Sequence, residues 1–296
     1  MTFFDRFSAA NSSGPPLSLQ LVFPEPLPLD SAALSAYTRE YHPEMAEAIV
    51  ELLSVADFPQ ARELVSDHGP AVAVVGLISW GAHVIKLAGF DAPMPYGPID
   101  SCVVPALMPP EVKEDAAKHA SHVLLYHAGP EPDVFERYLA LTAVSGVLAQ
   151  FGATAVLNEE ARTACPAFDL IPEPGEDAFA TIRSLPILYL FAGFVRTNVG
   201  APDRPWIRTY GNHHLGLPDL AYQTNGYHES STVFGWFNAM LGYLRETSAS
   251  FLPGQIVQFD DVTKFLFREP QESQADFLHS DGTMVVLERI PLESIS

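Results

Sequence analysis

Residues 204–220 read RPWIRTYGNHHLGLPDL, and this stretch decides how the second half of the chain folds. Residues 206–210 alternate large apolar and polar side chains, which predicts a strand. Gly211 and Gly216 mark the positions where the backbone can adopt a positive φ or approach another segment closely. The Leu-Pro-Asp turn that follows leads into a second short strand at 220–223. We therefore expect two short strands joined by a loop.

The loop between these strands contains two adjacent imidazoles, His213 and His214. One interpretation is a ligand loop, in which a metal ion would need a third ligand such as Asp219 or His228, because adjacent histidines rarely bind one ion together. A hydrolase working at residues 211–219 would use His213, His214 and Asp219. The other interpretation, the more common one for so short a motif, is a polar hairpin tip with two solvated imidazoles.

Composition restricts the classes of partner. The chain has 296 residues with 48% hydrophobic content, and its 16 Lys+Arg against 36 Asp+Glu give a formal charge of -20. Such a charge repels nucleic acid and anionic lipid, and it favours either a basic protein partner or simple solubility. No uncharged apolar run reaches the ~18 residues of a membrane span, and residues 1–16 do not resemble a secretory signal. We expect a cytoplasmic protein with a flexible lead-in at 1–16.

Motifs of known catalytic chemistry are missing from the sequence. It contains no G-x-S-x-G, Walker A, G-x-G-x-x-G or H-E-x-x-H pattern, so no catalytic residue, metal site or cofactor is predicted. Cys102 and Cys165 belong to no C-x-x-C pair. Two buried thiols in a reducing compartment are the simpler interpretation, and a disulfide between them stays open.

The order of expected elements indicates an α/β (α+β) fold with mixed, largely antiparallel sheets and packed helices. Ferredoxin-like pieces are the nearest simple template, and they could be duplicated. Residues 17–296 would form either a single domain or two similar halves, 17–175 and 176–296. The expected strands are 17–23, 71–78, 79–87, 121–127, 153–157, 185–197, 206–210, 220–223, 255–259, 264–268 and 283–290. One helix is expected to begin at Ala32. The other expected helices cover residues 44–53, 111–120, 133–151, 176–184 and 230–247.

A second unusual stretch, residues 89–100, carries three prolines and two glycines. We expect no helix there, because proline removes backbone donors and fixes φ. A rigid loop bearing Met94 and Tyr96 either lines a groove or serves as a structural crossover. Asn158 and Glu159 follow an expected strand, at the carboxyl end where α/β folds place ligands.

Two segments together resemble a known family. They are Ala92-Pro93-Met94-Pro95-Tyr96-Gly97-Pro98-Ile99, and Thr209-Tyr210-Gly211 followed by Leu215-Gly216-Leu217-Pro218-Asp219. They are similar to the marker segments of the bacterial domain-of-unknown-function family number 4261, over about residues 19–290. The resemblance carries no catalytic residue. It implies a stand-alone bacterial cytosolic protein, and such domains accompany toxin–immunity loci, which suggests an inhibitor role.

The leading hypothesis is a non-catalytic binding protein, most concretely an immunity-type inhibitor that contacts a basic bacterial toxin. Its acidic excess would accelerate association with such a partner, and aromatic and Met side chains are favoured anchors at interfaces. The two marker loops would converge on one surface. The alternatives are a hydrolase, metal-dependent or not, that uses the 211–219 loop, and a structural subunit without a small ligand. The predicted binding residues are Met94, Tyr96, Trp206, Tyr210, His213, His214 and Asp219.

Overall fold

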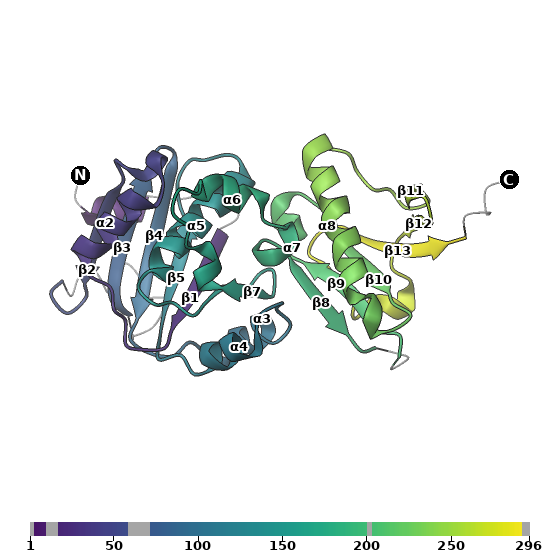
Figure 1. Cartoon of the computed structure of the whole chain (residues 1–296), viewed down its shortest axis with the longest axis horizontal. Helices are drawn as coiled ribbons and strands as arrows, with labels where there is room; N and C mark the ends of the chain where they lie inside the picture. The colour runs from purple at the N-terminus through teal and green to yellow at the C-terminus, as the bar shows by residue number, and fades with distance from the viewer. Residues whose placement is uncertain (1–2, 10–16, 59–71, 200–202, 292–296) are drawn as a thin grey trace. The chain divides into compact units, whose positions relative to one another are not determined.

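The protein has a mixed α+β fold with largely antiparallel sheets, as the sequence predicts (Figure 1). A computed structural model gives eight α-helices and two sheets, of seven and six strands, within the residues that it describes. The chain divides into two compact units, each with its own sheet. The first contains Met1–Glu159 and Ala164–Leu185, and the second contains Glu160–Thr163 and Pro186–Ser296. The described residues are 3–9, 17–58, 72–199 and 203–291.

The sheet of the first unit has β1 (Leu17–Phe23) in its interior, between β5 (Ser121–His127) and β6 (Ala155–Asn158). The strand order is β2-β3-β4-β5-β1-β6-β7. β1 is antiparallel to both neighbours, with Leu21 opposite Val123 on one side and Val156 on the other. The other strands are β2 (Ile49–Ser54), β3 (Val72–Trp80), β4 (His83–Phe90) and β7 (Thr163–Pro166).

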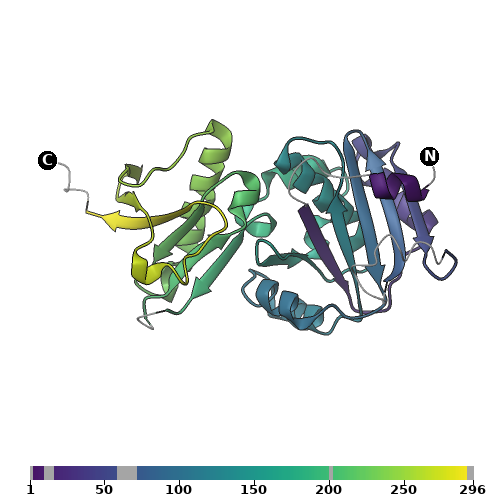
Figure 2. The same cartoon turned by 180° about the vertical axis from the view of Figure 1, so that it is seen from behind.

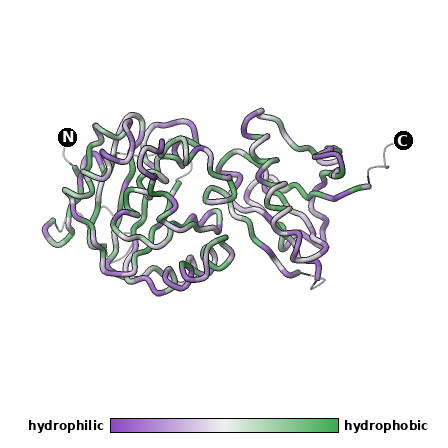
Figure 3. Tube along the Cα trace, viewed as in Figure 1, coloured by the Kyte–Doolittle hydropathy of each residue, from purple (hydrophilic) through white to green (hydrophobic). Residues whose placement is uncertain are grey.

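Helices α2 (Ser31–Tyr41) and α5 (Val134–Ala149) lie in front of this sheet in Figure 1. The Asp30 carboxylate accepts a hydrogen bond from the Ala33 amide at 2.8 Å, which caps α2. Fourteen of the 16 residues of α5 are buried, so this helix is enclosed on all sides and forms the centre of the unit. Figure 3 shows hydrophobic residues concentrated along α5 and the strands beside it. α6 (Ala178–Ser184) packs next to α5.

The opposite face of the sheet is covered by shorter helices. α3 (Tyr96–Cys102) and α4 (Pro110–Ala117) share a hydrophobic cluster with Val22 of β1 and Leu157 of β6. α1 (Phe3–Ala9) places Phe7 in a second cluster with side chains of β3 and β4, and Figure 2, the view from behind, shows α1 in front of the strands. The predicted lead-in at 1–16 contains this helix, and residues 1–2 and 10–16 lie outside the described part.

The second unit has the strand order β11-β12-β13-β10-β9-β8. β10 and β13 are parallel, and the other pairs are antiparallel. α8 (Ser230–Thr247) packs on one face, where Trp236 makes edge contacts with Tyr222 and Phe265. The elements are α7 (Ile187–Leu190), β8 (Gly193–Thr197), β9 (Trp206–Tyr210), β10 (Asp219–Gln223), β11 (Ile256–Asp260), β12 (Thr263–Arg268) and β13 (Met284–Ile290).

Three predictions of secondary structure were wrong. Residues 44–53 were expected to be helical, but a short 3-10 turn at Pro43–Met45 leads into β2, whose Leu52 pairs with Gly76 of β3. Residues 185–197 were expected to form one strand, but α7 occupies the first part, because Pro186 favours a helix start. The proline-rich stretch contains α3, since Pro98 falls in the first helical turn, where its missing donor does no harm.

Candidate functional site

The 211–219 loop of the second unit is held by a buried carboxylate, that of Asp219, which is 2% exposed. Asp219 Oδ1 accepts hydrogen bonds from Thr209 Oγ1 at 3.1 Å and from the Asn212 amide at 3.3 Å. Asp219 Oδ2 accepts one from Ser280 Oγ at 2.6 Å. The Arg208 guanidinium completes the surroundings, with Nη2 3.9 Å from Oδ2. One carboxylate thus ties β9, the loop and the segment before β13 together.

The ionisation of Asp219 is set by two opposing effects. Burial raises the pKa of this carboxyl, whereas the hydrogen bonds from Ser280 and Thr209 and the charge of Arg208 lower it. Burial prevails, so the folded pKa lies above the ordinary value. Both oxygens already accept hydrogen bonds, which makes Asp219 a structural hub of the loop.

Two glycines let the loop close. Gly211 has φ 83° and Gly216 has φ 69°, and they flank the 3-10 turn η4 (Asn212–Leu215). A Cβ at Gly211 would lie 2.9 Å from the Cα of Ala161, which belongs to the short segment Glu160–Thr163 of the same unit. These positions are the ones the sequence identified for unusual backbone, and the contact with Ala161 gives Gly211 a second reason to be glycine.

The two histidines of the loop have different surroundings. Their rings lie 4.0 Å apart, and His214 Nε2 is 3.5 Å from the Glu160 carboxylate. The side chain of His214 is only 10% exposed, and burial lowers its pKa, with the neighbouring His213 acting in the same direction. The expectation of two solvated imidazoles is therefore wrong for His214, because the adjacent segment that carries Glu160 covers it. His213 lines a cavity instead.

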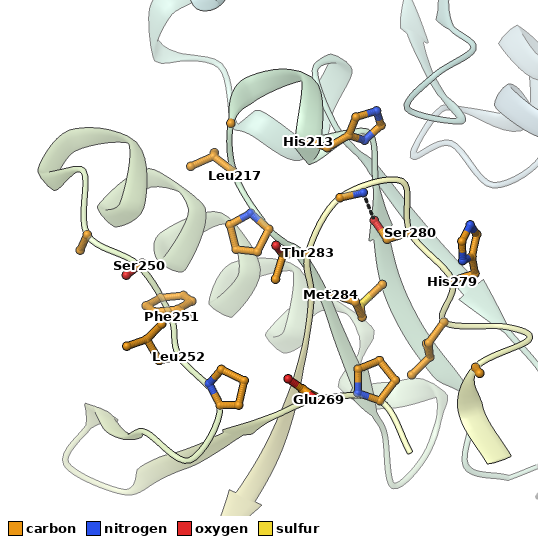
Figure 4. A pocket seen from close by; sticks show the side chains of 18 residues that line it. His213, Leu217, Ser250, Phe251, Leu252, Glu269, His279, Ser280, Thr283 and Met284 are labelled. Atoms are coloured by element: carbon orange, nitrogen blue, oxygen red, sulfur yellow. Dashed lines mark hydrogen bonds between the residues drawn. The ribbon is translucent and has the colours of Figure 1, made fainter. Parts of the chain in front are cut away.

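That cavity has a volume of about 850 Å³ and is formed within the second unit. Three stretches line it: part of the loop from His213 to Pro218, residues 249–253 after α8, and a stretch between Glu269 and Met284. Figure 4 shows Phe251 and Leu252 on one side and Met284 on the other. We call this cavity the apolar groove. Its lining combines prolines and large apolar groups with a few polar ones, which is typical of binding sites.

The predicted binding residues do not all reach a surface. Met94 is 4% exposed and belongs to a hydrophobic cluster of the first unit, and Trp206 is 5% exposed and packs beside Phe277. Tyr96, by contrast, is 81% exposed. Tyr210 is in cation–π contact with Arg208, whose guanidinium is 3.9 Å from the ring centroid. Of the seven residues, only His213 lines the apolar groove.

The seven residues also fall in different units. Met94 and Tyr96 belong to the first unit, and Trp206, Tyr210, His213, His214 and Asp219 belong to the second. The second set is gathered around one loop. The convergence of the two marker loops on a single surface stays a prediction.

Histidines fix the proline-rich stretch of the first unit. The Met94 amide donates to His119 Nε2 at 2.7 Å, and His119 Nδ1–H donates to the Ala116 carbonyl at 2.8 Å. His122 Nδ1–H donates to the Ala92 carbonyl, also at 2.8 Å. Burial lowers the pKa of both imidazoles, which keeps them neutral in this role. The stretch is thus held as a fixed part of the fold.

Sequence reasoning missed most of the groove. It predicts no site at residues 279–282, although His279, Ser280 and Gly282 line the cavity. The Phe251-Leu252-Pro253 run lies between the predicted helix 230–247 and the predicted strand 255–259, and all three residues line the cavity too. Leu252 is 61% exposed, a property that the sequence alone does not show.

Neither a metal centre nor a disulfide appears in the described part. Among residues 3–9, 17–58, 72–199 and 203–291, no three His, Cys, Asp or Glu side chains are grouped so that they could hold an ion. Cys102 and Cys165 do not form a disulfide, and both side chains are buried. Burial raises the pKa of Cys165 well above the ordinary thiol value.

Comparisons with known proteins give no relative: no family model, no curated protein and no solved structure matches this chain. Within the described residues, every helix is too short or too polar to cross a bilayer.

Proposed function

We propose that this protein is a non-catalytic binding protein of the bacterial cytoplasm, an immunity-type inhibitor that contacts a basic toxin. The observation that carries the proposal is the apolar groove of the second unit. Its occupant would be an extended segment of the toxin that carries apolar and basic side chains.

The lining of the groove supports such an occupant. Phe251 and Leu252 offer apolar surface that an incoming side chain would cover, and Pro253 and Pro270 make the walls rigid. Glu269 supplies a carboxylate in the same lining, which suits a Lys or Arg of the partner. Grooves that combine apolar pockets with fixed polar groups are a common mode of peptide recognition.

The charge of the chain supports a basic partner. A formal charge of -20 would attract a cationic protein and raise its rate of association, and the effect would weaken with salt. Tyr96 of the first unit stays a candidate contact, because most of its ring is exposed.

The hydrolase alternative receives less support from the geometry. It needs Asp219 within reach of a substrate, but this carboxylate is 2% exposed and accepts three hydrogen bonds. His214 lies beside Glu160 rather than in the groove. His213 is the only member of the proposed set in the cavity lining, and a single imidazole there equally suits recognition of a partner.

The test uses the product of the neighbouring gene. This product should be toxic when expressed alone, should be neutralised by co-expression of the present protein, and should bind it in a calorimetric titration. Leu252→Asp should weaken binding by about tenfold or more, since it replaces apolar surface worth about 1.5–3 kcal/mol by a carboxylate.

A matched variant controls for the added charge. Val262 is 66% exposed and Leu252 is 61% exposed, and Val262 does not line the groove. Val262→Asp should therefore leave the affinity nearly unchanged. The proposal fails if the neighbouring product is harmless, or if Leu252→Asp protects cells and binds as well as Val262→Asp does.

A further inference from the structure

A second cavity of the same unit has the opposite character. Its volume is about 440 Å³, and its lining includes three arginines, Arg204, Arg268 and Arg289, together with amide side chains such as Gln223 and Asn225. The whole chain has only 16 Lys and Arg among 296 residues. Three of them on one cavity make a local positive site on an acidic protein.

One of the three arginines is fixed by its own partners. Arg268 Nε donates to Glu288 at 3.2 Å, and its Nη1 donates to the Gln274 side chain at 3.0 Å and to the Glu269 carbonyl at 2.9 Å. Glu288 is the only acidic residue in the described lining of this cavity. Its negative charge is neutralised by the ion pair with Arg268. Arg268 therefore forms a fixed part of the cavity lining. The net positive charge of the lining comes from the other two arginines, Arg204 and Arg289.

The remaining two guanidinium groups are available. Arg204 precedes β9 and Arg289 lies near the end of β13, and both are exposed. Within the described residues, neither guanidinium has a hydrogen bond or an ion pair. Both act on the same buried group, Tyr222: burial and the charge of Glu229 raise the pKa of its hydroxyl, and the charges of Arg289 and Arg204 lower it. Two unpaired cations therefore flank one cavity.

We infer that this arginine pocket binds a small phosphorylated molecule. Guanidinium groups present planar donors that match the oxygens of a phosphoryl group, and charge-assisted bonds of this kind are strong. The amides of Gln223, Asn225 and Gln271 offer donors and acceptors for the uncharged part of the ligand. A volume of about 440 Å³ suits a small molecule. A long polyanion is disfavoured, because the charge of -20 would repel its remaining phosphates.

The test is a calorimetric titration of the full chain with inorganic pyrophosphate, at constant ionic strength. Wild-type protein should bind it, and the double variant Arg204→Gln/Arg289→Gln should bind it at least about tenfold more weakly, since both free cations are lost. The control is Arg196→Gln/Arg245→Gln, which removes the same charge from exposed positions of the same unit outside the cavity. This control should bind nearly as wild type does.

Three results would overturn the inference. They are no binding of pyrophosphate to the wild-type protein, an equal loss of affinity in the two double variants, and citrate binding as tightly as pyrophosphate. Equally tight binding of citrate would mean that the pocket recognises carboxylates rather than phosphoryl groups. If the pocket variant fails to fold, Arg289→Lys gives the same decision: it keeps the charge but loses the planar fork, so pyrophosphate affinity should still fall.

Discussion

At the scale of single residues, buried polar groups hold the folded structure in place. Asp219 combines three hydrogen bonds with the nearby Arg208, and both side chains are almost completely buried. His127 is 2% exposed, with its Nε2 3.3 Å from His83 Nδ1. Such groups are sensitive to substitution and to pH, since each charge or hydrogen bond lost in the interior has no water to replace it.

We expect Asp219→Ala to destabilise the second unit by about 3–5 kcal/mol, because it leaves the buried Arg208 charge without its carboxylate. Asp219→Asn should cost less, since it retains the shape and one acceptor oxygen. Urea unfolding measures both. Asp281→Ala is the control, because that side chain is 78% exposed, and its effect should stay within about 0.5 kcal/mol. Equal effects of Asp219→Ala and Asp281→Ala would contradict the structural role.

His127 should make the first unit sensitive to acid. Burial lowers its folded pKa from 6.5 to about 3, and the nearby His83 and Arg137 act in the same direction. Between these two pH values the unfolded chain binds more protons than the folded chain, so stability falls as pH falls from about 6.5 towards 3. In melts at several pH values, His127→Gln should reduce this dependence. His279→Gln, at a side chain 80% exposed, should preserve it.

At the scale of elements, helix packing determines which substitutions are tolerated. Gly146 of α5 has no space for a side chain: an added Cβ would lie 2.3 Å from the Tyr41 hydroxyl and 2.4 Å from the Leu170 carbonyl. Gly242 of α8 has no atom within 4 Å of the same position. Substituting alanine at Gly242 therefore tests helix propensity alone, whereas the same substitution at Gly146 tests propensity and packing together.

Gly242→Ala should stabilise the protein by about 0.5–1 kcal/mol, because alanine is the better helix former. Gly146→Ala should destabilise it by about 1–3 kcal/mol, because overpacking outweighs the same gain in propensity. The denaturant midpoints of the two variants, compared with that of the wild type, measure both changes in stability. A stabilised Gly146→Ala would mean that Tyr41 can move away.

Elements with a strong local pattern were predictable from the sequence. β1, β5, β9 and α8 have the predicted boundaries, because their periodicity agrees with the contacts that they make. β2 was missed because Met45, Ala48, Ile49 and Leu52 recur at helical spacing, whereas pairing with β3 imposes an extended chain. The apolar groove was out of reach, since its lining comes from stretches that only the fold brings together.

At the scale of the whole molecule, the acidic charge is unevenly divided. The first unit has 23 acidic and 8 basic residues, a net of -15, and the second has 13 and 8, a net of -5. Most of the attraction for a basic partner would therefore come from the first unit, whereas the apolar groove and the arginine pocket both belong to the second.

The second unit is discontinuous in sequence, and the contribution of its short segment to stability can be tested. Glu160–Thr163 packs within it, and a Cβ at Gly193 would lie 1.7 Å from the Ala161 carbonyl oxygen. A fragment of residues 186–296 lacks this segment and should melt at a lower temperature than a fragment of residues 160–296, or fail to fold. Circular dichroism melts compare the two. Equal melting temperatures would show that the segment adds nothing to stability.

One short stretch, residues 268–275, supplies lining to both cavities of the second unit. Arg268, Gln271 and Gln274 border the arginine pocket, and Glu269, Pro270 and Ala275 border the apolar groove. A ligand in one cavity that shifts residues 268–275 changes the space available in the other cavity. Thermodynamic reciprocity then requires that occupancy of either cavity alter the affinity of its neighbour by the same factor.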